Sequence, residues 1–318
     1  MRFYIIGLAA LIAATTFASA RAQTNPFLGT WNLTGAPPNE GNIYWLEVKD
    51  EGGKLSAMFL NRGGSPVPGN DVKIANDELT FVAAVSGESK PAVALRASGD
   101  KLTGTVKAAK ETVNVTGERP PKWGACDANA KHTFGKPVAL FDGKSMAGWD
   151  VQHKGQPSKW TIEDGAMTNT PPHDNNLVSK EKFRDFRIEA EYKLSPKGNS
   201  GIYLRGRYEL QVLDDAGAPP ESHGHMSIYS RRAPDVNASK PAGEWQTMQA
   251  TIVGNCVTVV LNGKTVHNNV RIPAITGGAL DAKETEPGPI MIQGDHEKVW
   301  FRKVIVSPIA SAQKSSGL

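Results

Sequence analysis

The stretch GNSGIYLRGRYELQVLDD, residues 198–215, alternates polar and apolar side chains through most of its length. Because side chains point to opposite faces along a β-strand, it predicts a hairpin that turns near Gly206 and buries one apolar face. The opposite face would carry four polar side chains, those of Tyr203, Arg205, Glu209 and Gln211. A solvated sheet face is the common fate of such residues. A cation, an anion, an amide and a phenol on one face also suit a site that grips a polyhydroxylated ligand.

Similar alternation recurs on both sides of this hairpin. Between residues 138 and 310, turn signals such as Asn262-Gly263 separate many short segments, and no amphipathic helix pattern occurs. These segments predict two sheets packed face to face. We therefore assign residues 138–310 to an all-β jelly-roll domain whose concave sheet carries the polar row.

A separate domain is predicted before it, at residues 24–118. Short alternating segments there are divided by Gly, Asn and Asp, and Leu55, Leu79 and Leu102 recur at nearly even spacing. This meander predicts a small antiparallel β barrel or sandwich. The segment contains no histidine or cysteine, so we expect an accessory domain without catalytic residues. Residues 119–137 mix Pro, Gly and polar residues without periodicity, which is typical of a linker.

The first 22 residues have a short basic start, an apolar run, and small residues before an expected cleavage ahead of Gln23. This is the pattern of an export signal. Its apolar run is shorter than the ~20 residues that a membrane span needs. We expect a secreted or periplasmic protein without a membrane span, and a disordered tail at residues 311–318.

Charge and motif content narrow the expected partners. The formal net charge is +4 without a basic stripe, so nucleic acid is not an expected partner. No glycine-rich phosphate-binding motif follows a strand, and the His-x-His of residues 223–225 lacks a diagnostic spacing, so we expect no cofactor and assign no metal. The two cysteines, Cys126 and Cys256, either pair in an oxidising compartment or remain thiols. Protein partners are left open.

Seven motifs of the second domain occur together in a characteristic order. They are LFDGKSMAGWD (140–150), WTIEDGAM (160–167), KFRDFRIEAEYKL (182–194), the hairpin above, KPAGEWQTM (240–248), VTVVLNGKTV (257–266) and GPIMIQGDHEKVWFRKVIVSPI (288–309). With these motifs the domain resembles the 3-keto-disaccharide hydrolase family, which has the concanavalin-like lectin/glucanase fold. The stretches between residues 214 and 229 and between 267 and 288 vary in that family and would shape substrate choice.

The resemblance implies cleavage of glycosides already oxidised at C3 of the sugar. A ketone at C3 acidifies the C2 hydrogen, so a base can remove it, the enolate expels the C1 leaving group, and water adds later. Such chemistry needs a base, a donor near the C3 oxygen and an acid for the leaving group. It does not need the two-carboxylate spacing of ordinary glycosidases.

With the resemblance in view, three residues are candidates for catalysis. Glu209 would act as general base or bind sugar hydroxyls, His296 would act as acid or base, and Arg205 would steady the enolate at the C3 oxygen. The candidate substrate-binding residues are Gln211, Glu191, Tyr203, Gln293, Lys240 and Trp245. A small sugar is therefore the expected partner. The alternative is a lectin-like binding module, which the same fold supports without catalysis.

Overall fold

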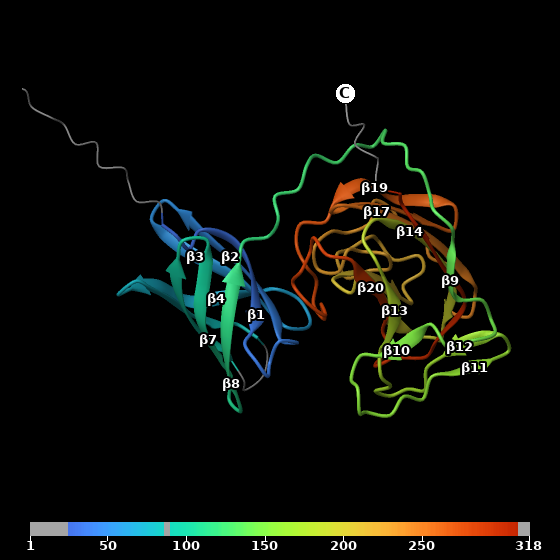
Figure 1. Cartoon of the computed structure of the whole chain (residues 1–318), viewed down its shortest axis with the longest axis horizontal. Coiled ribbons are helices and arrows are strands. Elements are labelled where there is room, and N and C mark those ends of the chain that lie inside the picture. Colours follow the sequence, from blue (N-terminus) through green and yellow to red (C-terminus); the bar gives the residue numbers. More distant parts are fainter. Residues whose placement is uncertain (1–24, 86–89, 311–318) are drawn as a thin grey trace, which may run out of the picture.

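The computed structural model describes residues 25–85 and 90–310, and within them the chain forms 21 β-strands and no helix (Figure 1). The described residues thus include no helix able to cross a membrane. The predicted export signal at residues 1–22 and the predicted tail at 311–318 lie outside the described residues. The predicted all-β fold is confirmed: a concanavalin-like β-sandwich follows an N-terminal barrel.

The first domain is a closed antiparallel barrel of eight strands in sequence order. The strands are β1 (Gly29–Gly35), β2 (Ile43–Glu51), β3 (Lys54–Asn61), β4 (Val67–Ala75), β5 (Glu78–Ala83), β6 (Ala92–Ser98), β7 (Lys101–Lys107) and β8 (Thr112–Glu118). β8 returns to pair with β1, for example through Leu33 and Gly117, which leaves the sheet without an open edge. Alternate apolar side chains such as Trp31 and Leu95 fill the interior.

The second domain consists of two antiparallel sheets. The smaller has the strand order β10 (Trp149–Val151), β13 (Leu177–Phe183), β20 (Gly288–Ile292), β15 (Asn199–Leu204) and β16 (Tyr208–Leu213). The larger has the order β11 (Thr161–Glu163), β12 (Ala166–Thr168), β21 (Val299–Pro308), β14 (Phe186–Leu194), β17 (Gln246–Val253), β18 (Cys256–Leu261) and β19 (Lys264–Arg271), and β9 (Val138–Phe141) also pairs with β21.

The two sheets enclose one apolar core. Ile188 of β14 in the larger sheet packs in the same cluster as Ile202, Leu210 and Ile292 of the smaller sheet. The apolar face expected for the hairpin is therefore a core face, and Ile290 and Ile292 of β20 join it in the core. The remaining side chains of β15, β16 and β20 must point away from the core, since neighbours along a strand face opposite ways.

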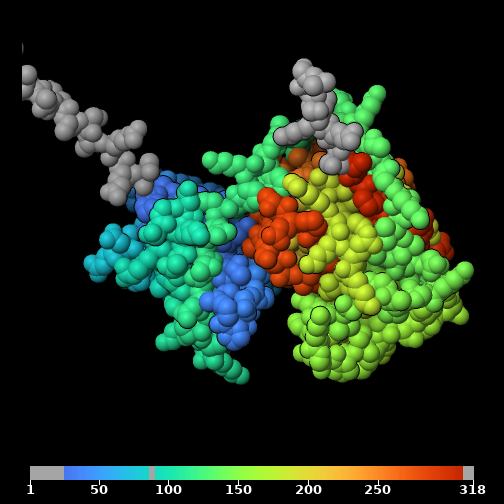
Figure 2. Space-filling view, viewed as in Figure 1, coloured from blue at the N-terminus to red at the C-terminus, as the bar shows by residue number. Residues whose placement is uncertain are grey.

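The barrel packs directly against the sandwich (Figure 2). Ile43, Trp45 and Leu60 of the barrel belong to the same apolar cluster as the sandwich core. At the polar margin, Asn32 Nδ2 donates to the carboxylate of Glu284 at 2.7 Å. Burial of apolar side chains between the two domains fixes their relative position, so the barrel is joined to the sandwich by more than its linker.

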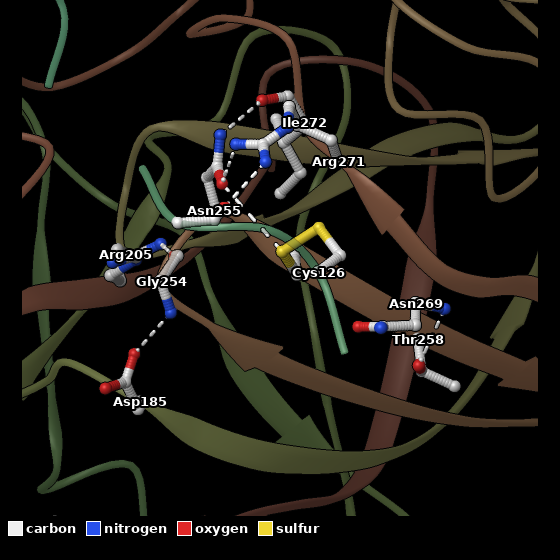
Figure 3. The surroundings of a disulfide bond; sticks show 11 residues. Cys126, Asp185, Arg205, Gly254, Asn255, Thr258, Asn269, Arg271 and Ile272 are labelled. Atoms are coloured by element: carbon white, nitrogen blue, oxygen red, sulfur yellow. Dashed lines mark hydrogen bonds between the residues drawn. A yellow bond between two sulfur atoms is a disulfide. The ribbon is translucent and has the colours of Figure 1, made fainter. Parts of the chain in front are cut away.

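The linker is also attached to the larger sheet, through a disulfide between Cys126 and Cys256 (Figure 3). Their Cα atoms lie 5.6 Å apart, which is an ordinary separation for a disulfide. Beside it, a guanidinium nitrogen of Arg271 donates to the carbonyl of Gly124 at 2.6 Å. The sequence left open whether Cys126 and Cys256 are paired, and the structure shows that they are.

Candidate active site

A cavity of about 420 Å³ lies over the outward face of the smaller sheet. Strands β15, β16 and β20 contribute Tyr203, Glu209, Gln211 and Met291 to its lining, and Gln293 follows β20. Its volume is within the usual range for small-molecule sites. Five of the residues predicted for the site line this cavity together: Tyr203, Glu209, Gln211, Gln293 and His296.

The hairpin register sets the floor of the cavity. Tyr203 is paired across the hairpin with Glu209, and Gly201 is paired with Gln211. A Cβ atom on Gly201 would lie 2.5 Å from Glu209 Oε1 and 2.9 Å from Gln293 Oε1. Only glycine therefore leaves room for these two side chains to lie across the strand. The sequence signal for this role was a glycine inside a strand, which often marks a close approach.

Glu209 is the buried carboxyl of the cavity, with 3% of its surface exposed. Burial raises its pKa from the usual 4.5 to about 8 because the charged form loses its hydration; the hydrogen bond from Tyr203 lowers the pKa, and the charge of Asp295 raises it. At pH 7 most Glu209 side chains are neutral. A carboxyl whose pKa lies near the working pH can both take up and release a proton.

Tyr203 connects Glu209 to two other groups. Its hydroxyl lies 2.8 Å from Glu209 Oε2 and 2.9 Å from the carbonyl oxygen of Gly277, and it accepts a hydrogen bond from Gln293 Nε2 at 3.0 Å. Burial raises the pKa of Tyr203 well above 10, so it stays a phenol with one proton. That proton can be donated to Glu209 or to Gly277, but not fully to both.

The protonation of Glu209 decides which arrangement holds. When Glu209 is neutral, its own O–H can donate to Tyr203, and the Tyr203 O–H then donates to Gly277. When Glu209 is ionised, Tyr203 must donate to the carboxylate, and the Gly277 carbonyl loses this donor. The hydrogen bonds of the cavity therefore change direction with the charge of Glu209.

Several polar atoms at the cavity have spare hydrogen-bonding capacity. Asn199 Oδ1, Gln293 Oε1 and Asp295 Oδ1 are buried and accept no hydrogen bond from any described residue. The Oε1 atom of Gln211 accepts from the backbone N–H of Val212 at 2.8 Å, which leaves its NH₂ group for another acceptor. Buried polar atoms without partners are rare in folded proteins. Hydroxyl groups of a ligand would supply the missing donors.

His296 lies where the sequence predicted, in the turn between β20 and β21, and it lines the cavity. Its side chain is 41% exposed, and its Nδ1 atom lies 3.8 Å from Asp295 Oδ1. His296 directly follows Asp295, whose Oδ1 is one of the buried acceptors without a partner.

Arg205 does not line the cavity, contrary to the prediction. β15 ends at Leu204, and Arg205 has a φ of 57°, so the alternation of the strand stops one residue too early to include it. Its buried guanidinium instead stacks over Tyr208, 5.2 Å from the ring centre, and donates to the carbonyls of Gly254 and Glu284. Burial lowers its pKa below the usual value of an arginine. Arg205 therefore cannot reach an oxygen of a ligand in the cavity.

Glu191, Lys240 and Trp245, also predicted to bind substrate, do not line this cavity. Glu191 belongs to β14 of the larger sheet and accepts from Arg302 Nε at 2.7 Å on the outer face. Lys240 is exposed and donates to the carbonyl of Trp245 at 3.0 Å. The Trp245 ring lies 4.3 Å from the guanidinium carbon of Arg302. None of the three lines the cavity, because Glu191 is in a strand of the larger sheet and Lys240 and Trp245 lie in the segment that leads into β17 of that sheet.

Sequence reasoning missed several lining residues. His153 and Asn176 come from the region between β10 and β13, and Tyr229 from the segment after β16. Asn176 also fixes the end of β20, since its Oδ1 accepts from the N–H of Gly294 at 2.8 Å. No periodic pattern marks loop residues. Of the two stretches said to vary in the family, the one between residues 267 and 288 contributes Gly277 and Gly278 to the lining, and Tyr229 directly follows the other.

The His-x-His stretch has local partners. His225 is buried, and its Nε2 lies 2.7 Å from the hydroxyl of Tyr192. His223 Nε2 lies 2.8 Å from Ser65 Oγ. Across residues 25–85 and 90–310, no group of three or more His, Cys, Asp or Glu side chains is arranged to hold a metal ion.

The fold and the cavity define a class: a concanavalin-like sandwich with a buried carboxyl and unpaired polar atoms on one sheet. The family model of the 3-keto-alpha-glucoside-1,2-lyase-like domain matches residues 136–307, more than half of the chain. The chain belongs to this family, as its motifs predicted.

The chain is also similar to individual proteins. A 3-keto-disaccharide hydrolase from Bacteroides thetaiotaomicron is 28% identical over 164 residues, which are 41% of this chain and 57% of that protein. The chain thus spans just over half the length of that curated relative. A Parabacteroides distasonis structure described as a glycosyl hydrolase has 29% identity and a TM-score of 0.47, covering 54% of this chain and 83% of that one. The glucanase SCLam, from family GH16, has 9% identity and a TM-score of 0.37, covering 60% and 95%.

Proposed function

We propose that this protein is an exported enzyme that cleaves glycosides bearing a ketone at C3, by elimination across C1 and C2 followed by hydration. Membership of the family supports the substrate class. The observation that carries the proposal is Glu209, a buried carboxyl with a pKa of about 8 at the floor of a polar cavity. Its elevated pKa makes the carboxylate a stronger base than an exposed one.

In the proposed first step, the Glu209 carboxylate takes the proton from C2. The electrons of the C2–H bond pass into an enolate whose negative charge rests on the C3 oxygen. Gln211, whose NH₂ group has no acceptor among the described residues, would donate a hydrogen bond to that oxygen in place of Arg205. The proposal thereby revises the donor predicted from sequence.

In the second step, the enolate electrons form the C1–C2 double bond and the bond from C1 to the leaving oxygen breaks. His296 would protonate that oxygen. Water then adds to C1: its hydroxyl bonds to C1, its remaining proton returns to His296, and C2 regains a proton from Glu209. The sum is hydrolysis to a free 3-keto sugar and an alcohol, and both acids return to their starting states.

The test uses 3-keto-trehalose and a 3-keto-glucoside with the native protein, Glu209→Gln, and Glu191→Gln as a control on the outer face. We expect release of the aglycone and exchange of the C2 hydrogen in the native protein and the control, with a loss of at least a thousandfold in Glu209→Gln. Exchange that persists in Glu209→Gln would move the base to another residue. Binding without turnover by the native protein would favour the lectin-like alternative.

The pH dependence provides a second test. If Glu209 is the base, kcat/KM should rise about tenfold per pH unit below its pKa of about 8 and level off above it. A rate that falls as pH rises through 8 would assign the neutral carboxyl as an acid instead.

A further inference from the structure

One wall of the cavity belongs to the barrel, which the sequence predicted to be an accessory domain without catalytic residues. The loop between β3 and β4, residues 62–66, contributes Gly63 and Gly64 to the lining. All other lining residues come from the sandwich domain. We call residues 62–66 the glycine loop.

The glycine loop meets the sandwich backbone against backbone. The N–H of Gly278 donates to the carbonyl of Arg62 at 2.8 Å. A Cβ atom on Gly277 would lie only 2.3 Å from the carbonyl oxygen of Gly64. The backbone of residues 63–64 therefore lies too close to Gly277 for a side chain at position 277.

Both ends of the glycine loop are anchored. On one side, Arg62 forms an ion pair with Glu111 of the barrel at 2.8 Å. On the other, Ser65 Oγ lies 2.6 Å from Ser230 Oγ, the residue after the cavity residue Tyr229. The loop is thus held by its own domain and by the sandwich, so it can act as a fixed wall.

The glycine loop also contacts the group that accepts from Tyr203. Gly277, whose carbonyl lies 2.9 Å from the Tyr203 hydroxyl, is the residue packed against Gly64. Gly278, with a φ of 79°, leaves room for that hydroxyl, since a Cβ there would lie 2.7 Å from it. The glycine loop is therefore separated from the Tyr203–Glu209 pair by a single residue, Gly277.

We propose that the glycine loop of the barrel determines specificity: it limits the size of the group attached to the 3-keto sugar, so that the site takes disaccharides and small glycosides. This inference rests on the proposed function. Gly63 lines the cavity, and a Cβ on it would have no described heavy atom within 4 Å, so this position has room for a larger side chain. Position 63 is therefore where the size limit can be changed.

The experiment compares Gly63→Phe with Gly41→Phe. Gly41 lies in another barrel loop, has the same free space for a side chain, and does not line the cavity. The substrates are methyl 3-keto-glucoside and 3-keto-trehalose. In Gly63→Phe we expect kcat/KM for the disaccharide, relative to the methyl glycoside, to fall at least tenfold. In Gly41→Phe the ratio should stay within twofold of the native value.

Each other outcome decides a different question. An unchanged ratio in Gly63→Phe, or an equal loss for both substrates, would overturn the proposed wall; if this variant does not fold, Gly63→Leu gives the same comparison. If the native protein cleaves neither sugar, the proposed function fails, and the ratio of Kd values for the two sugars then tests the wall. Failure of the native protein to bind either sugar would overturn both proposals.

Discussion

The two sheets of the sandwich each carry a row of polar side chains, but the rows differ in their surroundings. On the outer face of the larger sheet, Glu191 pairs with Arg302 while both stay partly exposed, at 27% and 45%. On the smaller sheet, Glu209 is buried and has no basic partner within 4 Å among the described residues. The same alternation of sequence thus yields a solvated surface on one sheet and a titratable cavity on the other.

The two polar rows differ because loops cover one of them and leave the other exposed to water. The loops after β10, β16 and β19, together with the glycine loop of the barrel, enclose the smaller sheet. Desolvation raises the pKa of Glu209, whereas water and opposite charges stabilise the outer carboxylates. A polar row becomes reactive when other parts of the chain remove its water.

The largest expected effect is on the pH dependence of stability. Because the folded pKa of Glu209 is raised from 4.5 to about 8, its contribution is fully present below pH 4.5 and is lost as pH rises to about 8. Relative to Glu209→Gln, the native protein should lose on the order of 4 kcal/mol of unfolding free energy between pH 5 and pH 9. Urea titrations at the two pH values measure this, and Glu191→Gln should follow the native curve. Parallel native and Glu209→Gln curves would contradict the raised pKa.

Removing the disulfide tests whether a change in the larger sheet can lower stability without lowering activity at the cavity of the smaller sheet. Cys256 begins β18 of the larger sheet, away from the cavity, and its bond to Cys126 closes a long loop with a sequence separation of 130. The double variant Cys126→Ser, Cys256→Ser should lose about 3 kcal/mol of unfolding free energy. Its kcat/KM at 25 °C should stay within twofold of native. A larger loss of activity in protein that remains folded would mean that the linker supports the cavity.

Gly201→Ala tests the cavity face directly. The new Cβ would displace the carboxyl of Glu209 and the amide of Gln293, because it would lie within 3 Å of both. We expect kcat/KM to fall about a hundredfold, or about 2.7 kcal/mol, with a smaller change in stability. Gly124→Ala, in the linker where a Cβ has free space, is the matched control. Equal activity in both variants would show that Glu209 need not lie where it does.

The sequence predicted the faces of single strands well because alternation is a local property. It assigned Tyr203, Glu209 and Gln211 to one face of the hairpin, and the structure brings them together in the cavity lining. It failed for Arg205, where a left-handed φ of 57° ends the strand. A turn conformation at a non-glycine residue leaves no clear mark in the sequence.

Two other errors have a longer-range origin. Glu191 alternates as regularly as Glu209, but which sheet a strand joins depends on pairing partners far along the chain, here Thr247 and Lys303. The contribution of Gly63 depends on how one domain packs on another. Sheet membership and domain packing both depend on residues far apart in the sequence. The faces of single strands could therefore be predicted, but the residues that line the cavity could not all be predicted.

The smallest expected effect is on the outer face. Removing the ion pair with Glu191→Gln should change the unfolding free energy by less than about 1 kcal/mol, because both partners are partly exposed and water replaces the lost contact. Thermal unfolding in 20 mM and 500 mM salt measures this, and the difference from native should shrink in high salt, since exposed charges are screened. A destabilisation of several kcal/mol would instead mean that the outer row is as desolvated as Glu209. The contrast between the two sheets would then lie in their partners and not in their exposure to water.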